Sequence, residues 1–248
     1  MDRRGLAELE LLEVARLYGA VEARGTRRET REVANADREP QSTQDHPLAA
    51  RAASLVPSLV ALMDWDALRE TVRSCTACGL CRQRKQAVFG VGNTAAPWLF
   101  IGEGPGAEED EQGDPFVGQA GKLLDSMLAA IGIARGREVY IANVVKCRPP
   151  GNRTPTPEEA TACAPYLDRQ IQLVKPKLLV ALGKSAAQRL LATDASLASL
   201  RGRVHRYKDT PVVVTYHPAY LLRTLPDKAK AWEDLLFARR TLNAAGAS

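Results

Sequence analysis

The sequence lacks the hydrophobic runs that mark membrane and secreted proteins. No apolar run among its 248 residues approaches the ~20 residues that a membrane-spanning helix needs. Its first twenty residues are interrupted by Glu8, Glu10 and Glu13, which argues against a secretory signal. We therefore expect a cytoplasmic protein with no membrane partner.

The sequence also lacks the common motifs for nucleotides and for hydrolytic catalysis. "ALGKS" (181–185) resembles the end of a phosphate-binding loop, but Leu178 occupies the place of the required glycine. "GEGPG" (102–106) does not have the spacing of a dinucleotide-binding fingerprint. Neither H-E-x-x-H nor G-x-S-x-G occurs. A nucleotide-dependent enzyme is therefore the least favoured class.

Cysteine is scarce, yet three of the five cysteines lie together in "CTACGLC" (75–81). Two overlapping C-x2-C pairs bring thiolates close enough to share a metal or a cluster. Cys147 and Cys163 supply two further thiols, and an odd number of cysteines in a reducing compartment argues against disulfides. The spacing leaves zinc and iron–sulfur both open, with Cys81 as the cysteine left over. The alternative is that some of these cysteines are small buried core residues.

Short apolar runs alternate with helical patterns after Cys75. The apolar runs predict four strands buried on both faces, at 97–101, 138–145, 177–183 and 211–216. The helical patterns lie between and after them, at 119–132, 157–174, 184–192 and 226–243. This order predicts an α/β fold, a three-layer α/β/α sandwich around a mainly parallel four-stranded sheet.

The N-terminal region has a different composition. A helical pattern covers 5–20, and a polar stretch over 24–46 has too few large apolar residues to form a core, which is typical of a disordered linker. A second helical pattern covers 52–74, with Pro57 in its first turn. We therefore divide the chain into an extension over 1–70 and a main domain over 71–245.

The segments that follow three of the predicted strands are expected to open onto one edge of the sheet. They are "GEGPG", "NVVKC" (143–147) and "HPAYLL" (217–222). In open α/β sheets, ligands bind beyond the carboxyl ends of the strands. His46 falls in the linker and His205 lies among arginines, so His217 is the best histidine for a functional role.

One of these segments carries an unusual combination of glycine and acid. "IGEGPGAEEDEQGDPFVGQAG" (101–121) holds six acidic side chains, although the net charge of the chain is +5. Glycines let the backbone approach a ligand closely, whereas carboxylates repel phosphate. The loop therefore does not suit a phosphate ligand, while the basic charge elsewhere suits a polyanionic partner.

Taken together, the motifs resemble the family-4, iron–sulfur branch of the uracil-DNA glycosylases. The matching segments are "GEGPGAEED" (102–110), "GDPFVGQAGKLLD" (113–125), "VYIANVVKCRPPGNRTPTPEE" (139–159), "LRGRVH" (200–205) and "TYHPAYLLR" (215–223). The resemblance implies a monomeric DNA-repair enzyme that acts on uracil in single- and double-stranded DNA. It would hydrolyse the N-glycosidic bond, release free uracil and leave an abasic site.

The resemblance also implies a 4Fe–4S cluster and a pocket for the flipped-out base. The cluster would be held by Cys75, Cys78, Cys147 and Cys163, without Cys81. The pocket would include Gly104, Phe116 as the stacking ring and Asn143 as the reader of the uracil edge.

The implied chemistry rests on stabilising the departing uracil. His217 would donate a hydrogen bond to uracil O2. The best-known branch has an aspartate where this chain has Gly104, so Glu103 and Glu109 are the candidates for orienting water or supporting the cationic sugar. Leu221 or Leu222 would wedge into the DNA, and Arg223 would contact the backbone.

Two alternatives remain open. A related branch traps itself covalently on DNA, but it carries a basic, histidine-containing insertion after "PFVG", and here "GQAGKLLDSML" continues without one. A cluster-bearing module that binds DNA without catalysis would leave the uracil in place.

Overall fold

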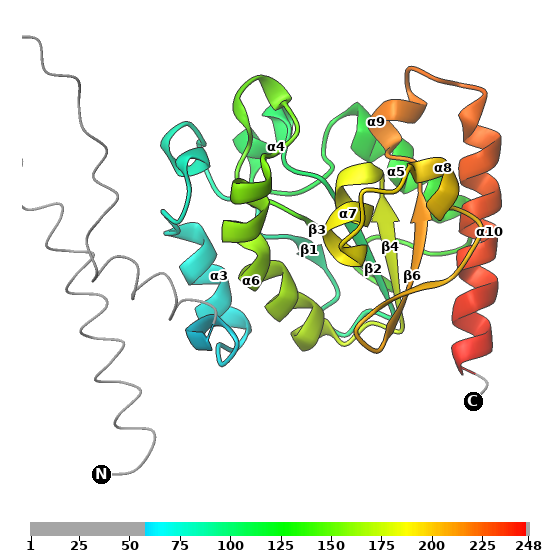
Figure 1. The fold of residues 1–248 in the computed structure, drawn as a ribbon, viewed down its shortest axis with the longest axis horizontal. Helices are drawn as coiled ribbons and strands as arrows, with labels where there is room; N and C mark the ends of the chain where they lie inside the picture. The colour runs from blue at the N-terminus through cyan, green and yellow to red at the C-terminus, as the bar shows by residue number, and fades with distance from the viewer. Residues whose placement is uncertain (1–57, 247–248) are drawn as a thin grey trace, which may run out of the picture. The chain divides into compact units, whose positions relative to one another are not determined.

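The four predicted strands form the parallel centre of one sheet (Figure 1). The structure is a computed structural model, and it describes residues 58–246. In their order across the sheet, the four strands are β3 (Val139–Asn143), β2 (Trp98–Gly102), β4 (Leu178–Leu182) and β6 (Thr210–Thr215). Every residue of β2, β3 and β4 is buried. Burial on both faces explains why these segments are continuous apolar runs and not alternating ones.

Two edge strands correct the predicted four-stranded sheet to a mixed, mostly parallel sheet of six. β1 (Val91–Gly92) pairs antiparallel with β3, and β5 (His205–Tyr207) pairs antiparallel with β6. β1 has only two residues, and β5 begins with a histidine and an arginine. Neither segment therefore has the apolar run by which strands are recognised in a sequence.

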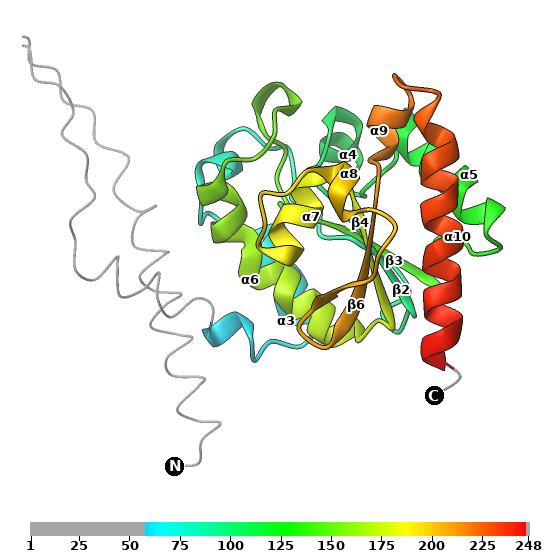
Figure 2. The same cartoon turned by 45° about the vertical axis from the view of Figure 1, so that its right-hand side comes forward.

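Helices cover both faces of the sheet (Figure 2). One face is covered by α3 (Trp65–Arg73), α6 (Pro157–Val174) and α7 (Lys184–Leu191), and the other by α5 (Gln119–Ala130) and α10 (Asp227–Gly246). The side chains of β2 alternate between the two cores: Leu99 and Ile101 point to the first, Trp98 and Phe100 to the second. The helices predicted over 119–132, 157–174, 184–192 and 226–243 all lie close to their expected ranges.

Several short helices were not predicted. Three of them follow central strands at their carboxyl ends: α4 (Ala107–Gln112), η2 (Pro150–Asn152) and α9 (Pro218–Leu221). The others are η1 (Gly79–Arg82), within the cysteine segment, and α8 (Leu197–Leu200). Helices this short have too few turns to show a period in the sequence.

The helix predicted over 52–74 is interrupted. Residues 58–60 are helical, but the chain then turns, and α3 begins after Asp64. The Asp64 carboxylate accepts a hydrogen bond from the Ala67 N–H at 2.9 Å, which is a typical N-cap. The interruption therefore has a local cause in the sequence that the apolar spacing concealed.

The predicted domain boundary at residue 70 falls inside α3, whose Leu68 and Val72 are buried in the first core. The predicted helix over 5–20, the linker over 24–46 with His46, and Pro57 lie outside the described residues. Within the described range, no helix combines the length and the apolar character needed to cross a bilayer.

Candidate active site and cysteine site

A pocket of about 460 Å³ opens at the carboxyl ends of β2, β3 and β6. It brings together seven of the predicted site residues: Glu103, Gly104, Glu109, Phe116, Asn143, His217 and Arg223. These residues come from the three segments that follow the strands, as the chain order predicted. The pocket is therefore a single place where their chemistry can combine.

Phe116 stands on the pocket wall in a strained conformation. Its φ of 56° is unusual for a bulky side chain. Arg135 fixes the backbone by donating hydrogen bonds to the carbonyls of Pro115 at 2.7 Å and Phe116 at 2.8 Å. A Cβ on Gly121 would lie only 1.9 Å from the Phe116 carbonyl oxygen, so this close approach requires glycine. The surrounding structure thus holds the Phe116 ring in one position.

The Glu109 carboxylate also holds this loop. One oxygen accepts the Gly106 N–H at 3.0 Å and completes the N-terminal cap of α4. The other accepts the N–H groups of Val117 at 2.9 Å and Gly118 at 3.1 Å. Both oxygens therefore bind the backbone on either side of the pocket, including the two residues that follow Phe116.

Glu103 has a different partner. Its carboxylate accepts a hydrogen bond from the hydroxyl of Ser185, in the first turn of α7. The neighbouring Gly104 has little room for a side chain, because a Cβ there would lie 2.8 Å from Cγ2 of Val145. Glu103 thus differs from Glu109, because it binds a side-chain hydroxyl where Glu109 binds backbone N–H groups.

Asn143 ends β3 with its amide facing the pocket, and it is 2% exposed. Among the described residues, its Oδ1 atom has no hydrogen-bond partner. A Cβ on Gly102 would lie 2.5 Å from this oxygen and 2.6 Å from Cζ of Phe116, so the amide and the ring meet beside Gly102. A buried acceptor without a partner costs about 1–3 kcal/mol, and a ligand can recover that cost.

His217 caps the N-terminus of α9. Its Nδ1 accepts a hydrogen bond from the Ala219 N–H at 3.1 Å, which leaves the proton of the neutral ring on Nε2. Its enclosure by the protein and the nearby Arg223 lower the pKa of His217 to about 4, although Glu109 acts in the opposite direction. At neutral pH the ring is therefore an uncharged donor, 5.4 Å from the Phe116 ring between centroids.

The two leucines predicted as a wedge occupy different environments. Leu221 is 1% exposed and packs into the protein, whereas Leu222 is 42% exposed. The buried leucine cannot enter a DNA stack without unfolding α9. Of the two leucines, only Leu222 is exposed enough to act as a wedge.

The sequence interpretation missed several pocket residues. Asn152, Arg153 and Thr154 line the pocket from the loop after β3, and Tyr220 lines it from α9. Arg153 is held by an ion pair with Glu159 at 2.7 Å. The Gly-Asn turn between prolines after a predicted strand was the available signal for this loop. The position of Ser185 was also informative, because residues that closely follow the carboxyl end of a strand such as β4 are expected near the site.

All five cysteines line one small cavity. Several groups donate hydrogen bonds to their sulfur atoms: the Arg84 guanidinium to Cys147 at 2.9 Å, the Lys146 N–H to Cys163 at 3.3 Å, the Tyr166 hydroxyl to Cys75 at 3.3 Å and the Ala77 N–H to Cys75 at 3.4 Å. Such donors are typical of the surroundings of cluster-bound thiolates.

The described thiols do not form a ready site for a single metal ion. In the part of the chain that the structure describes, no three side chains of His, Cys, Asp or Glu lie close enough to hold a single metal ion. Burial raises the pKa of Cys147 to about 11 and that of Cys163 to about 12, so these thiols ionise at neutral pH only beside a strong positive charge. The cysteines therefore line a common cavity, and they need a positive charge beside them to become thiolate ligands.

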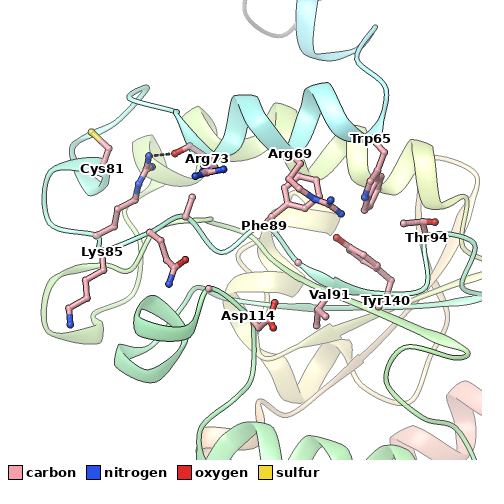
Figure 3. A pocket seen from close by; sticks show the side chains of 16 residues that line it. Trp65, Arg69, Arg73, Cys81, Lys85, Phe89, Val91, Thr94, Asp114 and Tyr140 are labelled. Atoms are coloured by element: carbon pink, nitrogen blue, oxygen red, sulfur yellow. Dashed lines mark hydrogen bonds between the residues drawn. The ribbon is translucent and has the colours of Figure 1, made fainter. Parts of the chain in front are cut away.

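A second hollow of about 900 Å³ is lined by residues of α3, by β1 and by Gly113 and Asp114, which follow α4 (Figure 3). Its cations each have a partner. Arg69 pairs with Asp66 at 3.9 Å, Arg73 pairs with Glu70 at 3.8 Å, and Lys85 pairs with Glu111. Arg84 binds the Arg73 carbonyl at 2.8 Å, drawn as the dashed line in Figure 3. The lining itself carries four basic side chains and one acidic side chain, that of Asp114.

Comparison with known proteins identifies the family. The model of the uracil DNA glycosylase superfamily matches residues 89–236. The type-4 uracil-DNA glycosylase of Thermotoga maritima is 47% identical over 160 residues, which cover 64% of this chain and 83% of the relative. The type-4 enzyme of Pyrobaculum aerophilum is 41% identical over 181 residues, covering 70% of this chain and 92% of the relative.

The matched region contains the whole pocket, from Glu103 to Arg223. A third relative, the type-4 uracil-DNA glycosylase of Archaeoglobus fulgidus, is 45% identical over 165 residues, or 63% of this chain and 82% of its own. With the site geometry and these matches in agreement, the chain belongs to the uracil-DNA glycosylase superfamily and, within it, to the type-4 uracil-DNA glycosylases.

Proposed function

We propose that this uracil-DNA glycosylase, acting in DNA repair, binds its flipped-out uracil in the pocket between Phe116, Asn143 and His217. The observation that best supports this assignment is the buried Oδ1 of Asn143, which has no partner among the described residues. Uracil carries an N–H at N3 beside the carbonyl oxygen O4, so one amide can satisfy both groups. The site then gains a partner for its buried acceptor only when the correct base enters.

Base selection follows from the same amide. The Asn143 Oδ1 accepts the uracil N3–H, and its NH₂ group donates to O4. Cytosine presents an acceptor at N3 and an amino donor at position 4, so both contacts would be mismatched. Because a site with buried polar groups strongly rejects a ligand that leaves them unpaired, cytosine is excluded. Phe116 stacks on the base plane and keeps its edge toward Asn143.

Catalysis rests mainly on stabilising the leaving group. As the N-glycosidic bond breaks, negative charge develops on uracil and positive charge on the sugar. His217 donates its Nε2–H to uracil O2, where that negative charge accumulates. The Ala219 N–H, bound to Nδ1, fixes the required tautomer, and the depressed pKa keeps the ring neutral.

The two candidate carboxylates have separate roles in this proposal. Glu103, held by Ser185, orients the attacking water or faces the cationic sugar. Glu109 is a positioning residue, because its oxygens bind three backbone N–H groups. Gly104 supplies no carboxylate, so water is captured late, after the bond to uracil has largely broken.

Contacts to DNA extend from α9. The exposed Leu222 fills the space that the flipped base leaves in the stack, and Arg223 binds the neighbouring backbone. Both residues follow His217 closely, so the wedge and the leaving-group donor move as one unit. The substrate is uracil in single- or double-stranded DNA, and we expect the protein to act as a monomer.

The cysteine site holds a 4Fe–4S cluster on Cys75, Cys78, Cys147 and Cys163. When bound, the cluster supplies a cross-link between the segment before η1, the segment after β3 and α6. The sulfurs of Cys75, Cys147 and Cys163 each accept a hydrogen bond, as cluster-bound thiolates commonly do. The choice of Cys78 over Cys81 as the fourth ligand rests on the resemblance to the type-4 enzymes.

Incubation with an oligonucleotide that contains one uracil, followed by alkali, tests the activity. Excision leaves an abasic site, which alkali converts into a strand break at the position of the uracil. The matched oligonucleotide with thymine in that position is the control and should remain intact. An intact uracil strand after incubation with iron-loaded protein would overturn the proposed function.

A further inference from the structure

Lys146 is a buried cation without a carboxylate partner. It is 1% exposed, and its Nζ donates to the backbone carbonyl of Asn143 at 2.9 Å and to Oε1 of Gln170 at 2.6 Å. Both acceptors are neutral, and no ion pair of Lys146 is recorded among the described residues. Burying an ammonium group is costly unless an opposite charge lies near it. The structure therefore calls for an anion in its surroundings.

The cysteine site is a source of such a charge, because the side-chain ammonium of Lys146 interacts electrostatically with Cys163 and Cys147. The backbone N–H of Lys146 donates to the sulfur of Cys163, and Cys147 is the next residue in the chain. A second cation, Arg84, donates to the sulfur of Cys147 at 2.9 Å and to the backbone carbonyl of Arg73 at 2.8 Å. Lys146 and Arg84 thus line the same small cavity from different segments of the chain.

We propose that Lys146 and Arg84 are the counter-cations of the loaded cysteine site, and that Lys146 is also a positioning residue that links this site to Asn143. The inference rests on the cluster assigned under the proposed function. Four thiolates outweigh the positive charge of an iron–sulfur core, so the loaded site is anionic. Lys146 and Arg84 offset this charge within a low-dielectric region.

The link to base recognition runs through one hydrogen bond. The ammonium of Lys146 binds the main chain of Asn143, whose side chain reads the uracil edge. When the site is loaded, Lys146 stays buried and holds that carbonyl. When the site is stripped, the ammonium loses its anion and moves toward water, because an unpaired buried charge is unfavourable. The carbonyl of Asn143 then loses its donor, and the amide loses its fixed direction.

The charge pairing is tested by combining the substitution of Lys146 with removal of the cluster and comparing the four resulting proteins. The unfolding midpoint of the full-length chain is measured for the wild type and for Lys146→Met, each in the iron-loaded and the stripped form. We expect the substitution to destabilise the loaded form more than the stripped form. Equal losses in both forms would show ordinary packing and overturn the pairing. Lys177→Met, at an exposed lysine, is the matched control and should leave all four values unchanged.

The reduction potential of the cluster gives a second readout that does not depend on folding of the stripped protein. A nearby positive charge favours the reduced cluster, so Lys146→Met and Arg84→Gln should each lower the potential, while Arg84→Lys should largely restore it. A potential unchanged in both charge-removing variants would overturn the role of the two cations.

Binding of free uracil tests the link to Asn143. Loss of one charge-assisted hydrogen bond should weaken uracil binding by about tenfold in loaded Lys146→Met and in the stripped wild type. Loaded Arg84→Gln should bind uracil like the wild type, because Arg84 does not contact Asn143. Wild-type affinity in Lys146→Met would overturn the link. A wild type that excises uracil but binds no iron would overturn this inference and the cluster, while leaving the glycosylase assignment intact.

Discussion

At the scale of single residues, His217 should carry the largest catalytic effect. Replacing it with alanine removes the donor to uracil O2 and should lower the rate of excision by roughly 10²–10³-fold, the usual cost of a lost oxyanion donor. Single-turnover release of uracil measures this step directly. His205→Ala is the control, because that ring lies in β5 and contacts the Leu200 carbonyl at 2.8 Å. Full activity in His217→Ala would contradict the leaving-group mechanism.

Arg223 should influence the pH profile through His217. Its positive charge helps to keep the pKa of His217 near 4, far below the ordinary value of 6.5. Replacing Arg223 with glutamine should raise that pKa, so the acid limb of kcat/KM moves to higher pH. The pH profile of kcat/KM with a short single-stranded substrate provides the measurement. An acid limb at the same pH in both proteins would contradict the assignment of the limb to His217.

The sequence was sufficient to predict which residues meet in the pocket, but not which partners each of them binds there. Asn143 and His217 each follow a buried parallel strand, and such segments meet at one sheet edge, so their meeting could be predicted. The partners of Glu109 could not, because they are backbone N–H groups whose directions depend on the strained loop at Phe116. The ammonium of Lys146 was equally hidden, since no local pattern predicts a buried lysine.

At the scale of secondary-structure elements, the neighbouring leucines of α9 provide a matched pair. Leu221→Ala removes buried side-chain volume and should lower the free energy of unfolding by about 2–5 kcal/mol. Leu222→Ala should leave stability nearly unchanged but slow excision from double-stranded DNA more than from single-stranded DNA, where no stack needs a wedge. Urea unfolding and parallel excision assays separate the two effects. Equal slowing on both substrates would argue against the wedge.

The loop between α4 and α5 should depend on Glu109. Glu109→Ala deprives three backbone N–H groups of their acceptor and should lower the free energy of unfolding by about 1–3 kcal/mol. The same change frees the Phe116 segment, so KM for uracil-containing DNA should rise. Urea unfolding and steady-state kinetics measure the two quantities. Glu108→Ala, at an exposed position of the same helix, is the control, and equal behaviour of the two variants would contradict the proposed role.

Element boundaries were predictable where the sequence carried both periodicity and caps. The helix expected over 157–174 was confirmed, since Thr156 and Glu159 form a capping box at its start. The helix predicted over 52–74 is helical at 58–60 and in α3, but it is interrupted because Asp64 caps a new helix within an apolar pattern that seemed continuous. The two edge strands were invisible because pairing with a neighbour, and not their own composition, creates them.

At the scale of the whole molecule, stability should fall in mild acid through His217. The folded protein holds this ring with a pKa of about 4, whereas the unfolded chain titrates near 6.5. Between these values the unfolded chain binds more protons, so the free energy of unfolding decreases as pH falls from 6.5 to 4. Urea unfolding at pH 7 and pH 5 measures the decrease. His217→Asn should show a smaller decrease, and an identical decrease would mean that other groups cause it.

The ends of the sheet have a consequence for molecules crowded along a DNA strand. β1 and β5 are two and three residues long and run against the parallel centre. Each therefore offers only a few free backbone groups, so neither edge is a template on which a second sheet can grow. Neighbouring molecules at closely spaced lesions should consequently remain separate particles and not fuse strand to strand.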